Sequence, residues 1–222
     1  MSGPLEGLKV LDLTRILAGP SCTQILGDLG ADVLKIERPS VGDDTRNFAP
    51  PFLPDGDNCD SSESAYFAGA NRNKRSVTLN LADPEGQALA RKLLADCDIL
   101  TENFKTGTLS KYNLGYEQLK DDFPGLIYCS ITGFGQTGPY AARPGYDALI
   151  QAMGGVMSLT GEPNGEPMKV GVSIADLMAG MYACVGILAA VRHKQLTGEG
   201  QAIDIGMLDT HVAWLANQGM NY

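Results

Sequence analysis

Short apolar runs of strand length alternate with segments of helical periodicity along the whole chain. Runs bounded by turn residues predict strands; they lie at residues 8–13, 32–37, 77–81, 98–102 and 126–132, with one more just after residue 200. Helical patterns fall between them; they run through residues 26–29, 83–97, 116–122, 146–154 and 177–191, and resume at residue 208. This alternation is typical of an α/β fold with an open, mostly parallel sheet flanked by helices.

The segment between the second and third strands lacks periodicity. Residues 38–63 are rich in Pro, Gly, Asp and Ser, and they predict a long loop. The loop after the first strand lies at the carboxyl end of that strand, where open α/β sheets bind ligands. We therefore expect a binding site at this edge of the sheet.

A long uncharged segment at residues 177–191 begins directly after Asp176 and ends before the cations of residues 192–194. Such a run predicts a buried helix, because a membrane span needs roughly 18 to 20 apolar residues. Asp176 would then sit at the positive end of the helix dipole. Ser173 and Asp176 also have the S-x-x-D spacing of a capping box. From spacing alone, Asp176 is either a helix cap or a carboxylate held there for chemistry.

Composition narrows the classes of partner. The 222 residues are 44% hydrophobic, enough for a large core, and the net charge of −9 argues against nucleic-acid or anionic-membrane partners. The five cysteines form no C-x-x-C pair and only two histidines occur, so no metal site is expected. Isolated cysteines in apolar context favour core packing over a Cys/His nucleophile. No signal peptide is visible, and this reduced pattern predicts a cytoplasmic protein.

Two polar segments follow or precede predicted strands and could contact a ligand. Arg72, Lys74 and Arg75 are the densest positive charge in the chain. They form either a solvated turn or, together with Arg38, a clamp for a phosphorylated ligand. The pair formed by Asn103 and Phe104 could hold a heterocycle, or it could be a turn with a core phenylalanine.

A glycine-rich loop follows the strand at residues 126–132. Gly133, Gly135 and Gly138 match G-x-G-x-x-G, but Pro139 and the R-P-G stretch at 143–145 prevent the helix that a dinucleotide site requires. These glycines instead predict a close approach of the backbone to a ligand or to a neighbouring chain.

Several segments, read in order, resemble the class III CoA-transferases. They are G-L-K-V-L-D-L-T-R-I-L-A-G-P, L-G-A-D-V-L-K-I-E-R-P, N-R-N-K-R-S, E-N-F, S-I-T-G-F-G-Q-T-G-P, and G-V-S-I-A-D-L-M-A-G with T-G-E-G-Q. The resemblance covers nearly the whole chain. It implies that residues 1–200 are the N-terminal part of a Rossmann-like, CoA-binding large domain. Residues 201–222 would be its last strand and the start of a linker helix toward a small domain.

The same resemblance assigns roles to individual residues. Asp176 corresponds to the family's nucleophilic aspartate, which forms an acyl anhydride and then an aspartyl-CoA thioester. Coenzyme A enters as the acyl-CoA substrate with a carboxylic acid as its partner, no metal takes part, and the full-length form is expected to be an interlocked homodimer. The implied CoA contacts are Leu17, Ala18, Arg38, Asn73, Lys74, Arg75, Asn103, Phe104, Lys111, Thr132, Gly133 and Phe134.

Two positions depart from the formyl-CoA transferase pattern. Lys111 stands in place of an arginine and Leu17 in place of a glutamine. Other stretches, such as G-D-D-T-R, are similar to the succinate–hydroxymethylglutarate CoA-transferase branch, which implies a dicarboxylate acceptor. Two alternatives stay open. One is an α-methylacyl-CoA racemase, although Tyr146 stands where racemases have a catalytic histidine. The other is a CoA-binding fragment without turnover, because family members are nearly twice as long.

Overall fold

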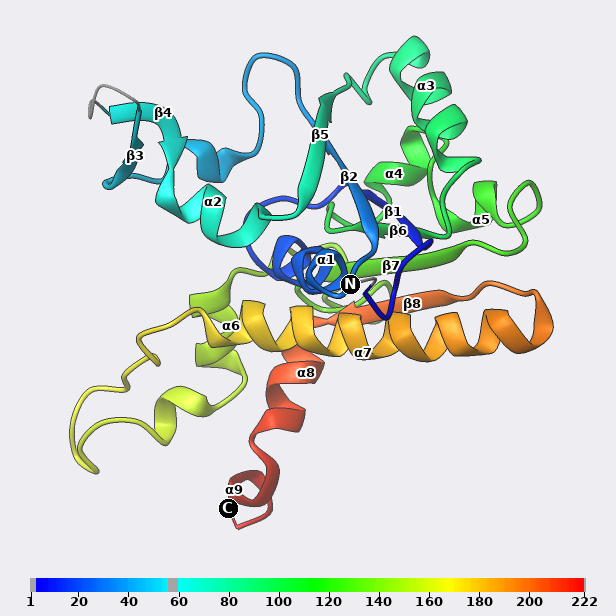
Figure 1. Ribbon diagram of the computed structural model, residues 1–222. Coiled ribbons are helices and arrows are strands. Elements are labelled where there is room, and N and C mark those ends of the chain that lie inside the picture. The colour runs from blue at the N-terminus through cyan, green and yellow to red at the C-terminus, as the bar shows by residue number, and fades with distance from the viewer. Residues whose placement is uncertain (1–2, 56–59, 222) are drawn as a thin grey trace.

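The computed structural model describes residues 3–55 and 60–221, whose centre is a six-stranded sheet (Figure 1). All of its recorded strand pairs are parallel, in the order β5-β2-β1-β6-β7-β8. The strands are β1 (Lys9–Asp12), β2 (Asp32–Glu37), β5 (Lys74–Thr78), β6 (Ile99–Glu102), β7 (Ile127–Thr132) and β8 (Ala202–Gly206). The predicted α/β class with an open parallel sheet is confirmed.

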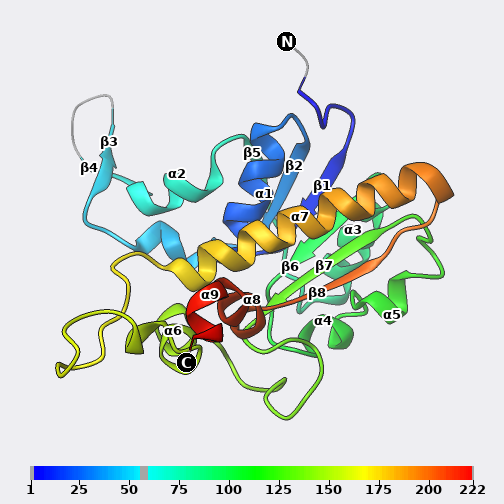
Figure 2. The same cartoon turned by 90° about the horizontal axis from the view of Figure 1, so that it is seen from below.

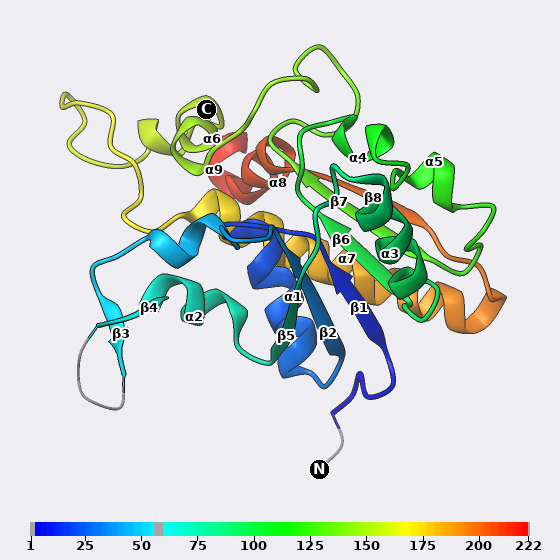
Figure 3. The same cartoon turned by 90° about the horizontal axis from the view of Figure 1, so that it is seen from above.

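Helices cover both faces of this sheet. Figure 2 looks onto the face covered by α1 and α7, and α3, α4 and α5 lie on the face turned to the viewer in Figure 3. The helices are α1 (Ala18–Asp28), α2 (Ala65–Asn71), α3 (Pro84–Leu94), α4 (Thr108–Lys111), α5 (Tyr116–Leu119), α6 (Asp147–Met153), α7 (Ile174–Thr197), α8 (Met207–Trp214) and α9 (Ala216–Met220), with 3-10 turns η1 (Asp44–Asn47) and η2 (Val156–Ser158).

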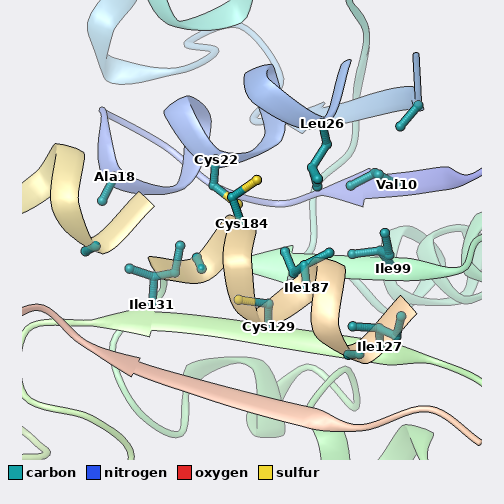
Figure 4. Close-up of a cluster of buried hydrophobic side chains, with 14 of the residues drawn as sticks. Val10, Ala18, Cys22, Leu26, Ile99, Ile127, Cys129, Ile131, Cys184 and Ile187 are labelled. Carbon is teal, nitrogen blue, oxygen red and sulfur yellow. The ribbon is translucent and has the colours of Figure 1, made fainter. Parts of the chain in front are cut away.

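Two hydrophobic cores follow from the alternation of side chains along the strands. Val10 points into the core beneath α1 and α7, and the next residue, Leu11, points into the core beneath α3 and α5. Figure 4 shows the first core, in which Cys22, Cys129 and Cys184 lie among aliphatic side chains. Burial raises the pKa of each of these thiols, so they fit core packing better than nucleophilic chemistry. Cys59 lies outside the described residues.

The central helix α7 is longer than predicted and is buried on one side only. Ala179, Ala183 and Ile187 face the core, whereas Tyr182 and Val185 are exposed. By length and composition α7 would suffice to cross a membrane, but here it packs along α1 and the sheet. The predicted buried helix is therefore confirmed for one side of α7 only. Its small buried residues explain the close helix packing, because a Cβ on Gly180 would lie 2.6 Å from the Ala18 carbonyl oxygen.

Other predicted boundaries also need correction. The predicted loop at residues 38–63 contains η1 and a two-stranded antiparallel sheet formed by β3 (Phe52–Pro54) and β4 (Asp60–Ser64). Strand β5 begins three residues before the predicted 77–81, because an edge strand with an exposed face does not require apolar residues. Helix α4 was not predicted, and the helical segment after residue 207 is divided into α8 and α9.

Candidate active site

The amino end of α7 is capped by a residue from another helix. Asp147, in the first turn of α6, accepts hydrogen bonds through Oδ1 from the backbone N–H groups of Ala175 (2.9 Å) and Asp176 (3.4 Å). Ser173 occupies the N-cap position but makes no side-chain capping bond. The predicted capping box is therefore wrong. Within the described part of the chain, the Asp176 carboxylate has no hydrogen-bond or ion-pair partner.

The environment of Asp176 disfavours its charge. Burial and, to a smaller extent, the negative charge of Asp147 together raise the pKa of this carboxyl group to about 7. Near neutral pH the group is therefore poised between its two protonation states. The same two carboxylates act on Tyr66 of α2, whose pKa is raised by burial first and then by Asp176. Helix α2 thus brings a phenol into the field of this acidic pair.

The loop between β1 and α1 lies next to α7. Gly180, one helical turn beyond Asp176, allows Ser21 and Ala18 of α1 to approach the backbone of α7. Leu17, the N-cap of α1, makes no side-chain capping bond, so the first turn of α1 offers backbone N–H groups. The predicted residues Leu17 and Ala18 are therefore brought to the same end of α7 as Asp176.

Asn103 fixes the shape of that loop instead of presenting its amide to a ligand. Its Oδ1 accepts from the Arg15 backbone N–H (2.8 Å), and its Nδ2 donates to the Arg15 carbonyl oxygen (2.7 Å). The next residue, Ile16, adopts a φ of +70°, which is unfavourable for a β-branched side chain. Strain of this kind is kept where the surrounding structure enforces it, often at functional sites.

A cavity of about 230 Å³ opens at the carboxyl edge of the sheet, as expected from the fold. Arg38 and Phe104, both predicted, lie on its wall, and Arg15 stacks over the Phe104 ring with its guanidinium carbon 5.8 Å from the centroid. Sequence reasoning missed the other lining residues, which include Leu79, Asn80, Leu81, Ala82 and Tyr112. Four of these directly follow β5. Their position after a parallel strand could have predicted that they line the cavity.

The predicted cluster at residues 73–75 does not reach this cavity. Arg75 pairs with Asp32, the first residue of β2, and Asn73 donates to Asp28 at the end of α1. The register places Lys74 beside Val33, so Arg38 lies at the opposite end of these strands. The predicted clamp formed by Arg38 and the basic cluster is therefore wrong.

Lys74 is a buried structural residue. Its ammonium group pairs with Asp12 (3.1 Å) and donates to the carbonyl oxygen of Pro20 (2.9 Å) and to Oδ1 of Asn71 (3.0 Å). Burial lowers the pKa of Lys74, and the neighbouring Asp12 carboxylate opposes this change. All three ammonium donors thus have acceptors within the protein, which leaves no donor for a phosphate.

The remaining predicted contacts are spread over two loops. Lys111 is exposed at the end of α4. Thr132 ends β7, and its buried hydroxyl has no partner among the described residues. Gly133 packs against Gly145, and a Cβ on Gly133 would lie 2.5 Å from the Gly145 Cα. This glycine therefore allows two loops of the same chain to pack closely. Phe134 contacts the core and the edge of Tyr140.

No group of three or more His, Cys, Asp or Glu side chains in the described ranges is arranged to hold a metal ion. Near Asp176 the structure places the Asp147 carboxylate, the Tyr66 hydroxyl and backbone N–H groups. The model of CoA-transferase family III matches residues 5–222. The chain belongs to CoA-transferase family III.

Named relatives in this family agree with the match. The chain is 52% identical over 219 residues to the succinate–glutarate CoA-transferase of Agrobacterium fabrum, covering 99% of this chain and 54% of the relative. It is 48% identical to the succinyl-CoA:glutarate CoA-transferase of Homo sapiens, covering 99% of this chain and 48% of that protein. The chain thus spans about half the length of these relatives.

A solved structure confirms the fold of this family III chain. The crystal structure of a CAIB/BAIF family protein from Brucella suis aligns with a TM-score of 0.95 and 53% identity, covering all of this chain and 58% of the other. At this level of similarity the overall backbone arrangement described above is shared with that structure.

The cap provided by Asp147 leads to a prediction about pH. Asp147→Asn should shift the midpoint of a pH–rate profile to lower pH, because it removes the second cause of the raised Asp176 pKa. The rate of covalent modification of Asp176 by an acyl-CoA, measured between pH 5 and pH 9, checks this. Asp96→Asn, at an exposed site, is the matched control. An unchanged midpoint in Asp147→Asn would contradict this role for Asp147.

Proposed function

We propose that this chain carries the nucleophile and part of the CoA site of an enzyme that moves CoA from an acyl-CoA thioester to a carboxylic acid. The observation that carries this proposal is the Asp176 carboxylate, which is partly buried and, within the described part of the chain, unpaired at a helix terminus capped by Asp147. A nucleophile needs a free, poorly hydrated lone pair, and a capping carboxylate would not have one. The family membership and the names of the relatives support the same chemistry.

In the first half of the reaction an Asp176 oxygen attacks the thioester carbonyl carbon. A C–O bond forms, the C–S bond breaks, and the CoA thiolate leaves an acyl–aspartyl anhydride behind. The thiolate then attacks the Asp176 carbonyl carbon, which gives an aspartyl-CoA thioester and releases the donor acid. The acceptor carboxylate and the same thiolate repeat these steps in reverse, and the Asp176 carboxylate is regenerated. Backbone N–H groups at the start of α1 are suited to hold the developing oxyanion.

The nucleotide end of CoA would occupy the cavity at the carboxyl edge of the sheet. Arg15 and Arg38 offer charge-assisted hydrogen bonds to phosphate, and the Phe104 ring offers an apolar face to the adenine. The 230 Å³ available suits a nucleotide better than a whole CoA molecule, so the pantetheine arm would extend from the cavity toward Asp176.

The substrate class that we propose is a pair of dicarboxylates. Its support comes from the relatives, whose printed names include succinate, glutarate and, at 47% identity, mesaconate as substrates. The cytoplasmic location and the interlocked homodimer stay predictions.

Incubation of the 222-residue chain with succinyl-CoA should produce a covalent adduct on the peptide that contains Asp176. Peptide mass spectrometry would detect either the succinyl anhydride, trapped with hydroxylamine, or the CoA thioester. Addition of glutarate should discharge the adduct and form glutaryl-CoA. Binding of CoA without an adduct would contradict turnover by this chain. Deuterium exchange at the α-carbon of a 2-methylacyl-CoA, again without an adduct, would indicate racemase chemistry instead.

A further inference from the structure

Asp44 bridges the two arginines on the wall of the cavity. Its Oδ2 accepts from Nη1 of Arg15 and its Oδ1 from Nη2 of Arg38, each at 2.7 Å. These two contacts are its only side-chain partners within the described part of the chain. A carboxylate held between two guanidinium groups takes the position that phosphate oxygens would take.

The cap of the 3-10 turn that carries Asp44 does not use this carboxylate. The 3-10 turn η1 is capped by the neighbouring Asp43, which accepts from the Thr45 backbone N–H at 3.0 Å and pairs with the buried Lys35 at 2.9 Å. By contrast, about a third of the Asp44 side chain is exposed, and its arginine partners are exposed to 36% and 49%. Ion pairs this accessible to water are weak and exchange partners readily.

The negative charge of Asp44 affects how strongly the two arginines can bind a phosphate. Arg15, Arg38 and Asp44 together carry a net charge of +1, and without the carboxylate the two arginines would carry +2. We propose that Asp44 is an internal competitor for a phosphate monoester. It holds Arg15 and Arg38 in the free protein, and it releases them when the ribose phosphate of CoA binds. This inference rests on the proposed CoA site.

The competition makes Asp44 a determinant of specificity. A ligand that carries a phosphate monoester brings two negative charges and displaces the single charge of Asp44. A ligand without that group leaves the bridge in place and gains nothing from the arginines. Asp44 therefore weakens the binding of CoA while preserving selection for its phosphate, which also favours release of the CoA product.

Calorimetric titration of the 222-residue chain tests this inference. Asp44→Asn should bind CoA and adenosine 3′,5′-bisphosphate about five- to tenfold more tightly than the unaltered chain, and dephospho-CoA equally well. Asp44→Ala should behave in the same way. The matched control is Asp32→Asn, which removes the carboxylate of another exposed arginine pair, with Arg75 at the opposite edge of the sheet. Thermal unfolding verifies that each variant is folded.

Four results would overturn the inference. Weaker CoA binding by Asp44→Asn would mean that Asp44 organises the arginines for the ligand. An equal gain for dephospho-CoA, or an equal gain in Asp32→Asn, would mean a general charge effect. If neither the unaltered chain nor any variant binds CoA, the proposed function fails at this site.

The titrations with adenosine 3′,5′-bisphosphate then test the inference by themselves. Tighter binding of this ligand by the Asp44 variants alone supports the inference, and unchanged binding overturns it.

Discussion

Replacing Asp176 by asparagine should remove CoA transfer and, above neutral pH, make the folded chain more stable. An amide cannot form the anhydride or the thioester, so we expect transfer to fall by at least ~10³-fold. The binding of CoA should change little, because the cavity that we assign to its nucleotide is lined by other residues. Steady-state transfer assays and calorimetry with CoA measure the two effects.

The stability effect follows from the pKa of Asp176. Its value of about 7 in the folded chain, against 3.8 for the unperturbed group, means that folding favours the protonated form. The free energy of unfolding is therefore unaffected by this group below about pH 4. It falls as the pH rises from about 4 to 7, and it is lower by about 4 kcal/mol above pH 7. Asp176→Asn removes this cost, so it should raise the unfolding free energy at pH 8 and leave it nearly unchanged at pH 4.

Chemical unfolding of Asp176→Asn at both pH values checks the sign of this effect. Asp96→Asn, an exposed aspartate at the end of the α3 segment, should leave transfer and stability unchanged at either pH. If Asp176→Asn lost stability while keeping transfer, Asp176 would be a structural cap and the proposed mechanism would be wrong.

Breaking the buried pair between Lys74 and Asp12 should cost about 3–5 kcal/mol of unfolding free energy. Burial by itself raises the pKa of Asp12, but the charges of Lys74 and Lys35 and the hydroxyls of Thr14 and Thr23 hold it well below its usual range. Lys74→Met leaves this carboxylate with one fewer countercharge in the core. Asp12→Asn instead leaves the ammonium of Lys74 without its partner.

Urea unfolding of the two single variants and of the double variant measures the coupling between these residues. The double variant should lose less stability than the sum of the single losses, since no charge of the pair then stays uncompensated. Arg75→Ala, next along the strand, removes an exposed ion pair and should cost at most about 1 kcal/mol. If Lys74→Met kept full stability but bound CoA poorly, the phosphate role of Lys74 would have to be restored.

Strands buried on both faces were predicted well from the sequence. Every residue of β7 is buried, and the predicted run at 126–132 matches it to within one residue. The first helix after β5 was equally clear, because Asp83 caps it through the Glu85 N–H and Pro84 opens it. In these segments the hydrophobic pattern and the local hydrogen bonds lie within a few neighbouring residues.

Segments at the periphery were predicted poorly. The edge strand β5 begins with charged residues and is largely exposed. The apolar residues that predicted a strand therefore lie only at its end and beyond it. The pair of β3 and β4 forms through contacts within a segment rich in Pro and Gly, where composition indicates only a loop. A hydrophobic pattern in the sequence arises where side chains are buried, and most of the described side chains of these strands are exposed or only partly buried.

The sequence by itself determined the parallel sheet, the position of Asp176 at the start of a long apolar helix, and the family. The tertiary structure alone decided the partner of each polar group. Asp147 caps α7, Asn103 binds the backbone of Arg15, and Lys74 neutralises Asp12, across separations of 28, 88 and 62 residues. A side chain has no sequence signal for a partner so distant, because only the folded backbone brings the two groups within hydrogen-bond reach.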